Sequence, residues 1–261
     1  MALEKATGII IRLGDYSETS QIAVFLTDAF GRVSAIAKGA KRPRSSTGGT
    51  LDMLTLNEIV FSPSSSGGLA TLREARTLEQ YAGVRASTAR YYAALYLAEL
   101  AFIFSEGADG SRGCFDLVVS SLGALAARPV SVANTVAFFE AGMLSLSGLA
   151  PNLETCARCG QKPDGHSVRI SLEDGGILCG NCRGGVPVTR GCLASLRRVF
   201  RSSVAGVQRL RLPKAVEHDV GGLLTAFIVH HTRSVPRMAR YVKPYLDGQL
   251  RKWSPQARAA K

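Results

Sequence analysis

Hydrophobic residues in the first 80 positions occur in short segments, where they alternate with polar residues between clusters of Gly, Asp and Ser. A period of two is typical of strands that bury one face. The pattern predicts five strands, within residues 6–14, 20–27, 32–40, 54–62 and 69–77. Because a closed sheet has no exposed edge, five short strands favour a small barrel. The OB-fold is the most common five-stranded barrel, although the pattern alone also allows an SH3-like barrel.

The hydrophobic spacing changes after Val84, where apolar residues recur at every third and fourth position. This is the period of amphipathic helices that pack on a core. The pattern predicts helices within residues 87–106, 114–127, 131–148, 191–203, 213–232 and 236–250. The aromatic residues of the first and third of these segments share the helical spacing, so we expect them in the core and not stacked on bases.

Four of the six cysteines form two C-x-x-C pairs, Cys156 with Cys159 and Cys179 with Cys182. A C-x-x-C turn directs two thiolates to one point, and two such turns provide the tetrahedral sulfur set that Zn²⁺ accepts. The residues between the pairs predict a short hairpin that turns at 174–176. We therefore expect one zinc ion in a zinc ribbon or knuckle module. An iron–sulfur cluster fits less well, because its usual ligand spacings differ.

The remaining cysteines and the histidine within this module are not expected to bind metal. Four thiolates leave no coordination position for water, so the zinc ion is expected to be structural and not catalytic. His166 is interpreted as a surface residue. Cys114 and Cys192 are isolated in apolar segments, which indicates small buried side chains.

These patterns together predict an α+β multidomain protein in which the zinc module is inserted into a helical domain. The expected divisions are an OB-fold at 1–80, the first part of the helical domain at 81–150, the zinc module at 151–189, a basic second part of the helical domain at 190–252, and a flexible tail at 253–261.

The net charge is +12, and the whole excess lies near the C-terminus. Residues 190–261 contain 15 Lys and Arg against three acids, whereas residues 1–189 contain 17 of each. Such an asymmetry favours a polyanionic partner, because cations that neutralise phosphates release counterions. A basic face that only keeps the protein in solution is the alternative.

Two groups of cations are candidate DNA-binding residues. The first group is Lys38, Lys41, Arg42 and Arg44, and the second is Arg197, Arg198 and Arg201. The first lies in a loop with Gly, Pro and Ser, which can close over a single strand or be an ordinary solvated loop. The second shares one face of a predicted helix. Both are expected to contact the nucleic-acid backbone without discriminating bases. Arg233, Arg237 and Arg240 predict a further basic stripe.

Several motifs that would indicate an enzyme do not occur in the sequence. It has no G-x-x-x-x-G-K-[ST] phosphate loop, no H-x-E deaminase signature and no G-x-S-x-G nucleophile elbow. It also has no apolar run of about 18 residues, and the pattern of its first residues does not predict a signal peptide. We therefore expect a cytoplasmic protein that binds its partner without catalysis. In that compartment paired cysteines indicate metal ligands and not disulfides.

Three segments resemble the RecO family of bacterial recombination mediators. They are GIIIRLGDYSETSQIAVFLTDAFGRVSAIAKGAKRPRS at 8–45, AGMLSLSGLAPNLETCARCG at 141–160 and YVKPYLDGQL at 241–250. The first is the most specific, because a strand, a polar turn and the basic loop occur together in it. The resemblance covers nearly the whole chain. It implies an N-terminal OB-fold and a helical domain into which the zinc module is inserted.

The same resemblance implies a function in the RecF pathway of DNA repair and recombination, at the nucleoid. It implies binding to single- and double-stranded DNA, annealing of complementary strands and partnership with RecR. It also implies loading of RecA onto strands coated by single-stranded DNA-binding protein. Because the zinc cysteines are not universal in that family, the metal is expected to support folding. The alternatives are an RNA-associated zinc-ribbon protein without a recombination role and a metal-dependent nuclease, although the acids that a nuclease requires are not clustered.

Overall fold

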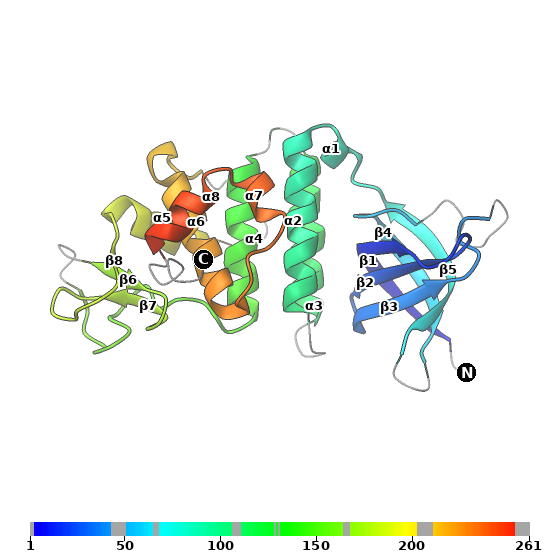
Figure 1. Cartoon of the computed structure of the whole chain (residues 1–261), viewed down its shortest axis with the longest axis horizontal. Coiled ribbons are helices and arrows are strands. Elements are labelled where there is room, and N and C mark those ends of the chain that lie inside the picture. The colour runs from blue at the N-terminus through cyan, green and yellow to red at the C-terminus, as the bar shows by residue number, and fades with distance from the viewer. Residues whose placement is uncertain are drawn as a thin grey trace. The chain divides into compact units, whose positions relative to one another are not determined.

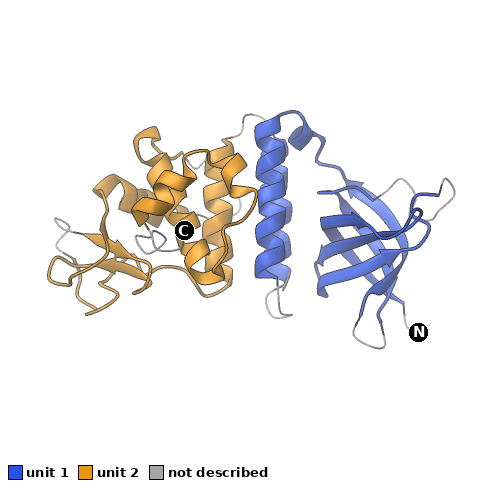
Figure 2. Ribbon diagram, viewed as in Figure 1, with its two compact units in different colours: residues 1–129 blue, residues 130–261 orange. Residues whose placement is uncertain are grey.

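The structure is a computed structural model that describes residues 3–42, 51–64, 68–105, 111–127, 129, 131–163, 168–202 and 211–253 (Figure 1). The chain forms two compact units, Met1–Pro129 and Val130–Lys261 (Figure 2). In the described ranges, no helix is both long and apolar enough to cross a membrane. Arg44, His166 and residues 254–261 of the predicted tail lie outside these ranges.

The first unit begins with a closed barrel. Its strands are β1 (Glu4–Asp15), β2 (Gln21–Thr27), β3 (Gly31–Ala37), β4 (Leu56–Ser62) and β5 (Ala70–Glu79). Strand β1 pairs antiparallel with both β2 and β4, and β3 pairs in parallel with β5, which gives the order β1-β2-β3-β5-β4. The five strands and the OB-like barrel predicted from alternation are confirmed.

Side chains on the inner face of each strand fill the barrel. Buried and half-buried residues alternate along β3, as a period of two requires. Ile10, Phe25 and Ile59 have no exposed surface and belong to one hydrophobic cluster. The pairing of β1 with β2 shifts register between Ile10 and Arg12. Such a bulge bends a strand, which helps β1 to pair with a neighbour on each side.

Three helices follow the barrel within the first unit: α1 (Ala82–Arg85), α2 (Thr88–Phe104) and α3 (Ser111–Ala126). Helix α2 packs against β1. The Phe102 ring lies near two barrel arginines, with the guanidinium carbon of Arg32 at 4.6 Å and that of Arg12 at 5.1 Å from its centroid. Arg32 also donates a hydrogen bond to the carbonyl oxygen of Phe102 at 2.9 Å. These contacts fasten the barrel to α2.

The second unit contains the helices α4 (Val132–Leu146), α5 (Arg190–Phe200), α6 (Lys214–Thr232), α7 (Ala239–Val242) and α8 (Leu246–Trp253). The side chains of Ser131 and Thr189 cap α4 and α5 by accepting hydrogen bonds from backbone N–H groups of the first turn. Helix α6 begins after Pro213, as predicted. The aromatic residues Tyr96, Phe138 and Phe139 and the cysteines Cys114 and Cys192 are buried, as predicted for core residues, whereas Tyr91, Tyr92, Phe102 and Phe104 are half-buried.

A three-stranded sheet with the order β7-β6-β8 lies between α4 and α5 in the chain. Its strands are β6 (Arg169–Ser171), β7 (Gly176–Leu178) and β8 (Val186–Pro187). Strands β6 and β7 form the hairpin predicted between the cysteine pairs. A side chain at Gly176 would collide with the backbone of Asn152, whose carbonyl oxygen accepts the N–H of Ile177 at 2.9 Å. Glycine is therefore required where β7 meets the chain before the cysteines.

The single helix predicted at 236–250 is wrong, because the chain forms α7 and α8 with a break between them. Pro244 disfavours helical backbone at the residue before it, and Lys243 has φ −128° and ψ 80°. The predicted stripe of Arg233, Arg237 and Arg240 is also wrong. Arg233 ends α6 in the left-handed conformation, Arg237 lies in a turn and Arg240 lies in α7, so the three residues do not share one helix.

The break at Lys243 places its side chain in the core of the second unit. The Lys243 Nζ atom lies 2.7 and 2.6 Å from the two carboxylate oxygens of Glu140 on α4. It also donates to the Gly221 carbonyl oxygen at 2.9 Å and contacts the Thr225 hydroxyl at 2.8 Å, both on α6. Glu140 has no exposed surface, and Lys243 is 4% exposed. Burial lowers the pKa of Lys243, whereas the charge of Glu140 and its hydrogen bonds oppose that shift.

Replacing Lys243 with Met is expected to destabilise the second unit by about 3–5 kcal/mol, since the Glu140 carboxylate would stay buried without its cation. The fluorescence of Trp253, the single tryptophan, reports unfolding of this unit in a urea titration. The double variant Lys243→Met/Glu140→Leu removes both charges and is expected to recover much of the loss.

The matched control is Arg240→Ala, which removes an exposed ion pair with Asp247. Its expected cost is below about 1 kcal/mol, because exposed pairs contribute little. Equal losses for Lys243→Met and Arg240→Ala would contradict the assigned importance of the buried pair.

Candidate metal centre and nucleic-acid surface

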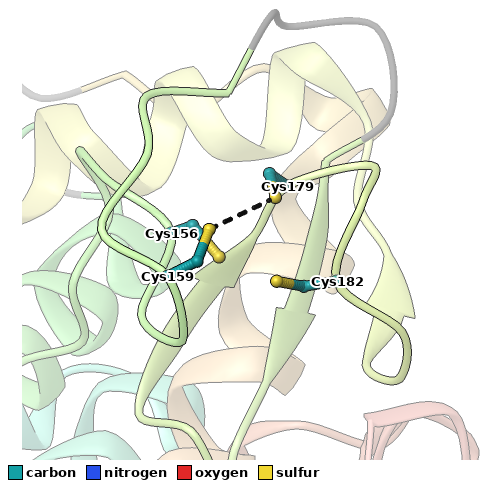
Figure 3. A group of neighbouring side chains, drawn as sticks. All are labelled: Cys156, Cys159, Cys179 and Cys182. Carbon is teal, nitrogen blue, oxygen red and sulfur yellow. Dashed lines mark hydrogen bonds between the residues drawn. The ribbon is translucent and has the colours of Figure 1, made fainter.

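Two tight turns carry the four paired cysteines (Figure 3). In the first turn, the N–H of Gly160 donates to the carbonyl oxygen of Cys156 at 2.8 Å. In the second turn, the N–H of Cys182 donates to the carbonyl oxygen of Cys179 at 3.2 Å. The N–H of Ala157 donates to Ile177 of β7 at 2.7 Å, and β7 ends next to Cys179. The hairpin therefore holds the two turns together.

The four Sγ atoms all lie within 4.8 Å of one another. Sulfur ligands about 2.3 Å from a tetrahedral ion lie about 3.8 Å apart. The Sγ atoms of Cys159 and Cys179 are 3.7 Å apart. The geometry and the thiolate donor set fit a single metal ion held by the residues predicted from their spacing, which are Cys156, Cys159, Cys179 and Cys182.

The pKa values of the cysteine thiols in the cluster are shifted in different directions. Burial raises the pKa of Cys156, but backbone N–H groups of Cys179, Cys159 and Arg158 outweigh it and lower that pKa to about 6. Burial, followed by the neighbouring thiols, raises the pKa of Cys182 to about 12. Four thiolates this close repel one another, so a cation between them allows all four to ionise.

Arg158, inside the first cysteine turn, braces the module from outside the sulfur cluster. Its Nε and Nη2 atoms donate to the Asp174 carboxylate at 3.0 and 2.9 Å, and its Nη1 atom donates to the Arg183 carbonyl oxygen at 2.7 Å. Hydrogen bonds from Arg158 and then Ser171 lower the pKa of Asp174. One side chain thereby joins the first turn, the hairpin turn and the residue that follows Cys182.

The cations predicted to contact phosphate in the barrel lie directly after β3. Lys38, Lys41 and Arg42 are all exposed. The Lys41 Nζ atom lies 2.7 Å from the Asp15 carboxylate, and hydrogen bonds from Lys41 and then Gln21 lower the pKa of Asp15. Of the described members of this group, Lys38 and Arg42 therefore offer the more accessible positive charge.

The three arginines predicted to share one helix face lie at the C-terminal end of α5, where Arg201 is the residue after the helix, and they have different surroundings. The Arg197 Nη2 and Nε atoms donate to the carbonyl oxygen of Leu153 at 2.6 and 2.9 Å. Arg201 Nη2 lies 2.7 Å from the carboxylate of Glu154. Arg198 is exposed. Arg197 and Arg201 thus attach α5 to the chain just before the first cysteine turn, and their contact with DNA stays a prediction.

Tyr16 is a candidate binding residue that hydrophobic periodicity does not indicate. It lies in the turn between β1 and β2, and 62% of its surface is exposed. An aromatic residue in a turn that precedes a basic loop is a usable sequence signal, because aromatic and cationic side chains together are typical of single-strand binding surfaces.

Comparison with known proteins gives matches over nearly the whole chain. Residues 1–81 match the family described as Recombination protein O N terminal, and residues 85–240 match Recombination protein O C terminal. A protein from Anaeromyxobacter dehalogenans named DNA repair protein RecO is 36% identical over 231 residues, which cover 87% of this chain and 91% of the relative. A protein of the same name from Moorella thermoacetica is 32% identical over 235 residues, which cover 88% of this chain and 86% of the relative.

The purified protein is expected to contain about one metal ion per chain, measured by inductively coupled plasma mass spectrometry. Cys159→Ser is expected to lose most of it, because the site would keep only three thiolates. The control Cys192→Ser changes a buried cysteine outside the cluster and should retain the metal. A parent protein without metal, or Cys159→Ser with a full equivalent, would contradict the assignment.

Proposed function

Because the chain belongs to the recombination protein O family of DNA repair and recombination mediators, we propose that it binds single- and double-stranded DNA and anneals complementary strands. The match of both halves of the chain to this family is the observation that carries the proposal. The net charge of +12 supports it, since fixed cations attract a phosphate backbone.

Annealing by this protein requires no covalent chemistry. Two DNA strands repel each other through their phosphates, and a cationic surface that holds both strands lowers that barrier. The proposed contacts are Lys38, Lys41, Arg42 and Arg44, which follow β3 in the sequence, and Arg197, Arg198 and Arg201 at the C-terminal end of α5. Because these contacts are to phosphate, they hold strands of any sequence. The protein in this proposal is a binding protein and not an enzyme.

The metal in this proposal is one structural zinc ion. A set of four thiolates suits zinc, and it leaves no position for a reacting water molecule. Bound metal would stabilise the module, because the unfolded chain does not hold the four sulfurs together. The exposed fraction of Cys159 leaves one ligand accessible to chelators, so metal loss can be tested on the folded protein.

The protein partners in this proposal are RecR and single-stranded DNA-binding protein. With RecR, the protein would help to load RecA onto DNA coated by single-stranded DNA-binding protein, at the nucleoid. Family membership supports these partners. Reconstitution of RecA loading with and without RecR tests this part separately from DNA binding.

Neutralising the exposed barrel cations is expected to change the salt dependence of DNA binding. The logarithm of affinity for a single strand falls against the logarithm of salt concentration with a slope of about −0.7 for each phosphate contact. The variant Lys38→Gln/Arg42→Gln should make the slope shallower by about 1.4. Fluorescence anisotropy of a labelled oligonucleotide over a salt series measures it.

The matched control is Lys5→Gln/Arg76→Gln, which removes the same number of cations from the same barrel. Both of these residues pair with the Glu58 carboxylate, at 3.0 and 3.2 Å, so little change in slope is expected. If the two double variants have the same slope as the parent, Lys38 and Arg42 do not contact phosphate.

The protein is expected to accelerate annealing of complementary oligonucleotides at low salt, followed by quenching between labelled strands. The acceleration should disappear as the screening length falls from about 10 Å at 0.1 M salt to about 3 Å at 1 M. Unlabelled single-stranded DNA and RNA of the same sequence serve as competitors. No acceleration at low salt would refute the annealing proposal, and preference for RNA would favour an RNA-associated zinc-ribbon protein.

A further inference from the structure

The turn between β1 and β2 is closed by its own hydrogen bonds, although it lies at the surface. The N–H groups of Tyr16 and Ser17 both donate to the carbonyl oxygen of Ser20, at 2.9 and 3.2 Å. The N–H of Ser20 donates in return to the Ser17 hydroxyl at 3.2 Å. Three hydrogen bonds within five residues fix the backbone that carries the Tyr16 side chain, so its ring is presented with little loss of backbone freedom on binding.

The same turn is bonded to the segment that follows β3. The N–H of Lys41 donates to the Thr19 carbonyl oxygen at 3.1 Å, and the N–H of Gly39 donates to the Ser20 hydroxyl at 3.3 Å. The Lys41 Nζ atom reaches the Asp15 carboxylate at 2.7 Å. Residues 15–20 and 38–42 therefore form one assembly, which we term the two-turn platform.

The Tyr16 ring is the exposed aromatic group of this platform. Its exposure of 62% exceeds that of Phe30, whose ring packs edge-on against Phe61 at 5.4 Å. Within the part of the chain that the structure describes, the Tyr16 side chain makes no hydrogen bond and no ring contact. An exposed ring on a fixed backbone loses little entropy when it stacks on a flat ligand.

Charge on the platform favours a ligand that carries phosphate. Lys38 and Arg42 are exposed beside the turn, and the Asp15 carboxylate is compensated by Lys41. Glu18 is the other acid of the platform. A ligand with a flat ring and a neighbouring anion fits this arrangement, and an unpaired nucleotide in a DNA strand has both.

We propose that Tyr16 stacks on an unpaired base while Lys38 and Arg42 contact the adjoining phosphates, so that the two-turn platform distinguishes single-stranded from double-stranded DNA. This inference rests on the proposed DNA-binding function. The faces of bases within a duplex are covered by their neighbours, so the ring gains its contact only where a base is free. The cations contribute to both kinds of DNA, and the ring contributes to one.

The test compares three oligonucleotides of equal length at one salt concentration: a thymidine single strand, an abasic single strand and a duplex. Tyr16→Ala is expected to weaken binding to the thymidine strand by about 5- to 150-fold, the range for loss of one base stack. Binding to the abasic strand and to the duplex should not change, since neither offers a free base. The salt slope should also be unchanged, because no cation is removed.

Two further substitutions at Tyr16 separate stacking from other causes. Tyr16→Phe keeps the ring and should bind like the parent, whereas Tyr16→Leu keeps an apolar side chain without a ring and should bind like Tyr16→Ala. The control Tyr241→Ala removes a tyrosine that is 64% exposed in the second unit and should leave all three affinities unchanged.

The outcomes separate this inference from the proposed function. If the parent protein binds none of the three oligonucleotides, DNA binding itself is refuted. If the parent binds and Tyr16→Ala binds the thymidine strand equally well, the stacking role is refuted and DNA binding stands. Equal losses on all three oligonucleotides would also refute stacking, because such losses indicate a contact to phosphate or damage to the turn.

Discussion

The buried ion pair of Lys243 and Glu140 determines how the second unit is built. An ammonium group in the core must have its hydrogen-bond donors satisfied, because an unpaired buried charge costs several kcal/mol. The partners come from α4 and α6, so these helices and the break between α7 and α8 have to be fixed in one arrangement. Glycine at position 221 leaves room for the segment after α7 to pack on α6, since a Cβ atom there would lie 2.6 Å from the Tyr245 hydroxyl oxygen. Helix α5 packs on both α4 and α6, and the metal module is attached to α5 through Arg197.

Ion pairs within the second unit reduce how much of the C-terminal positive charge is available to a partner. The sequence of the last quarter shows many cations and few acids, but acids elsewhere in the second unit pair with some of them. Glu140 pairs with Lys243, and Glu154 pairs with Arg201. A count of charges along the chain therefore overstates the charge that is free for a phosphate backbone. The barrel shows the opposite case, because its balanced composition still leaves Lys38 and Arg42 exposed at one place.

Local patterns predicted the strands and the cysteine cluster, since alternation and C-x-x-C spacing are set by neighbours in the chain. The break at Pro244 also has a local signal, because proline restricts the residue before it, but the prediction of one helix across 236–250 takes no account of that proline. The contact of Lys243 with Glu140 joins residues 103 positions apart, which no local period reports. The joining of the Tyr16 turn to the segment after β3 follows from the antiparallel pairing of β2 with β3, which places Gln21 opposite Ala37.

The proposed stacking contact also bears on how a protein can anneal strands. A protein that gripped the hydrogen-bonding edges of bases would have to release them before a second strand could pair. A ring that stacks on a base contacts its face, and cations that bind phosphate contact the backbone, so both leave the pairing edges free. Neither contact depends on sequence. In this proposal the two-turn platform combines the two kinds of contact that would hold a single strand while it stays available to its complement.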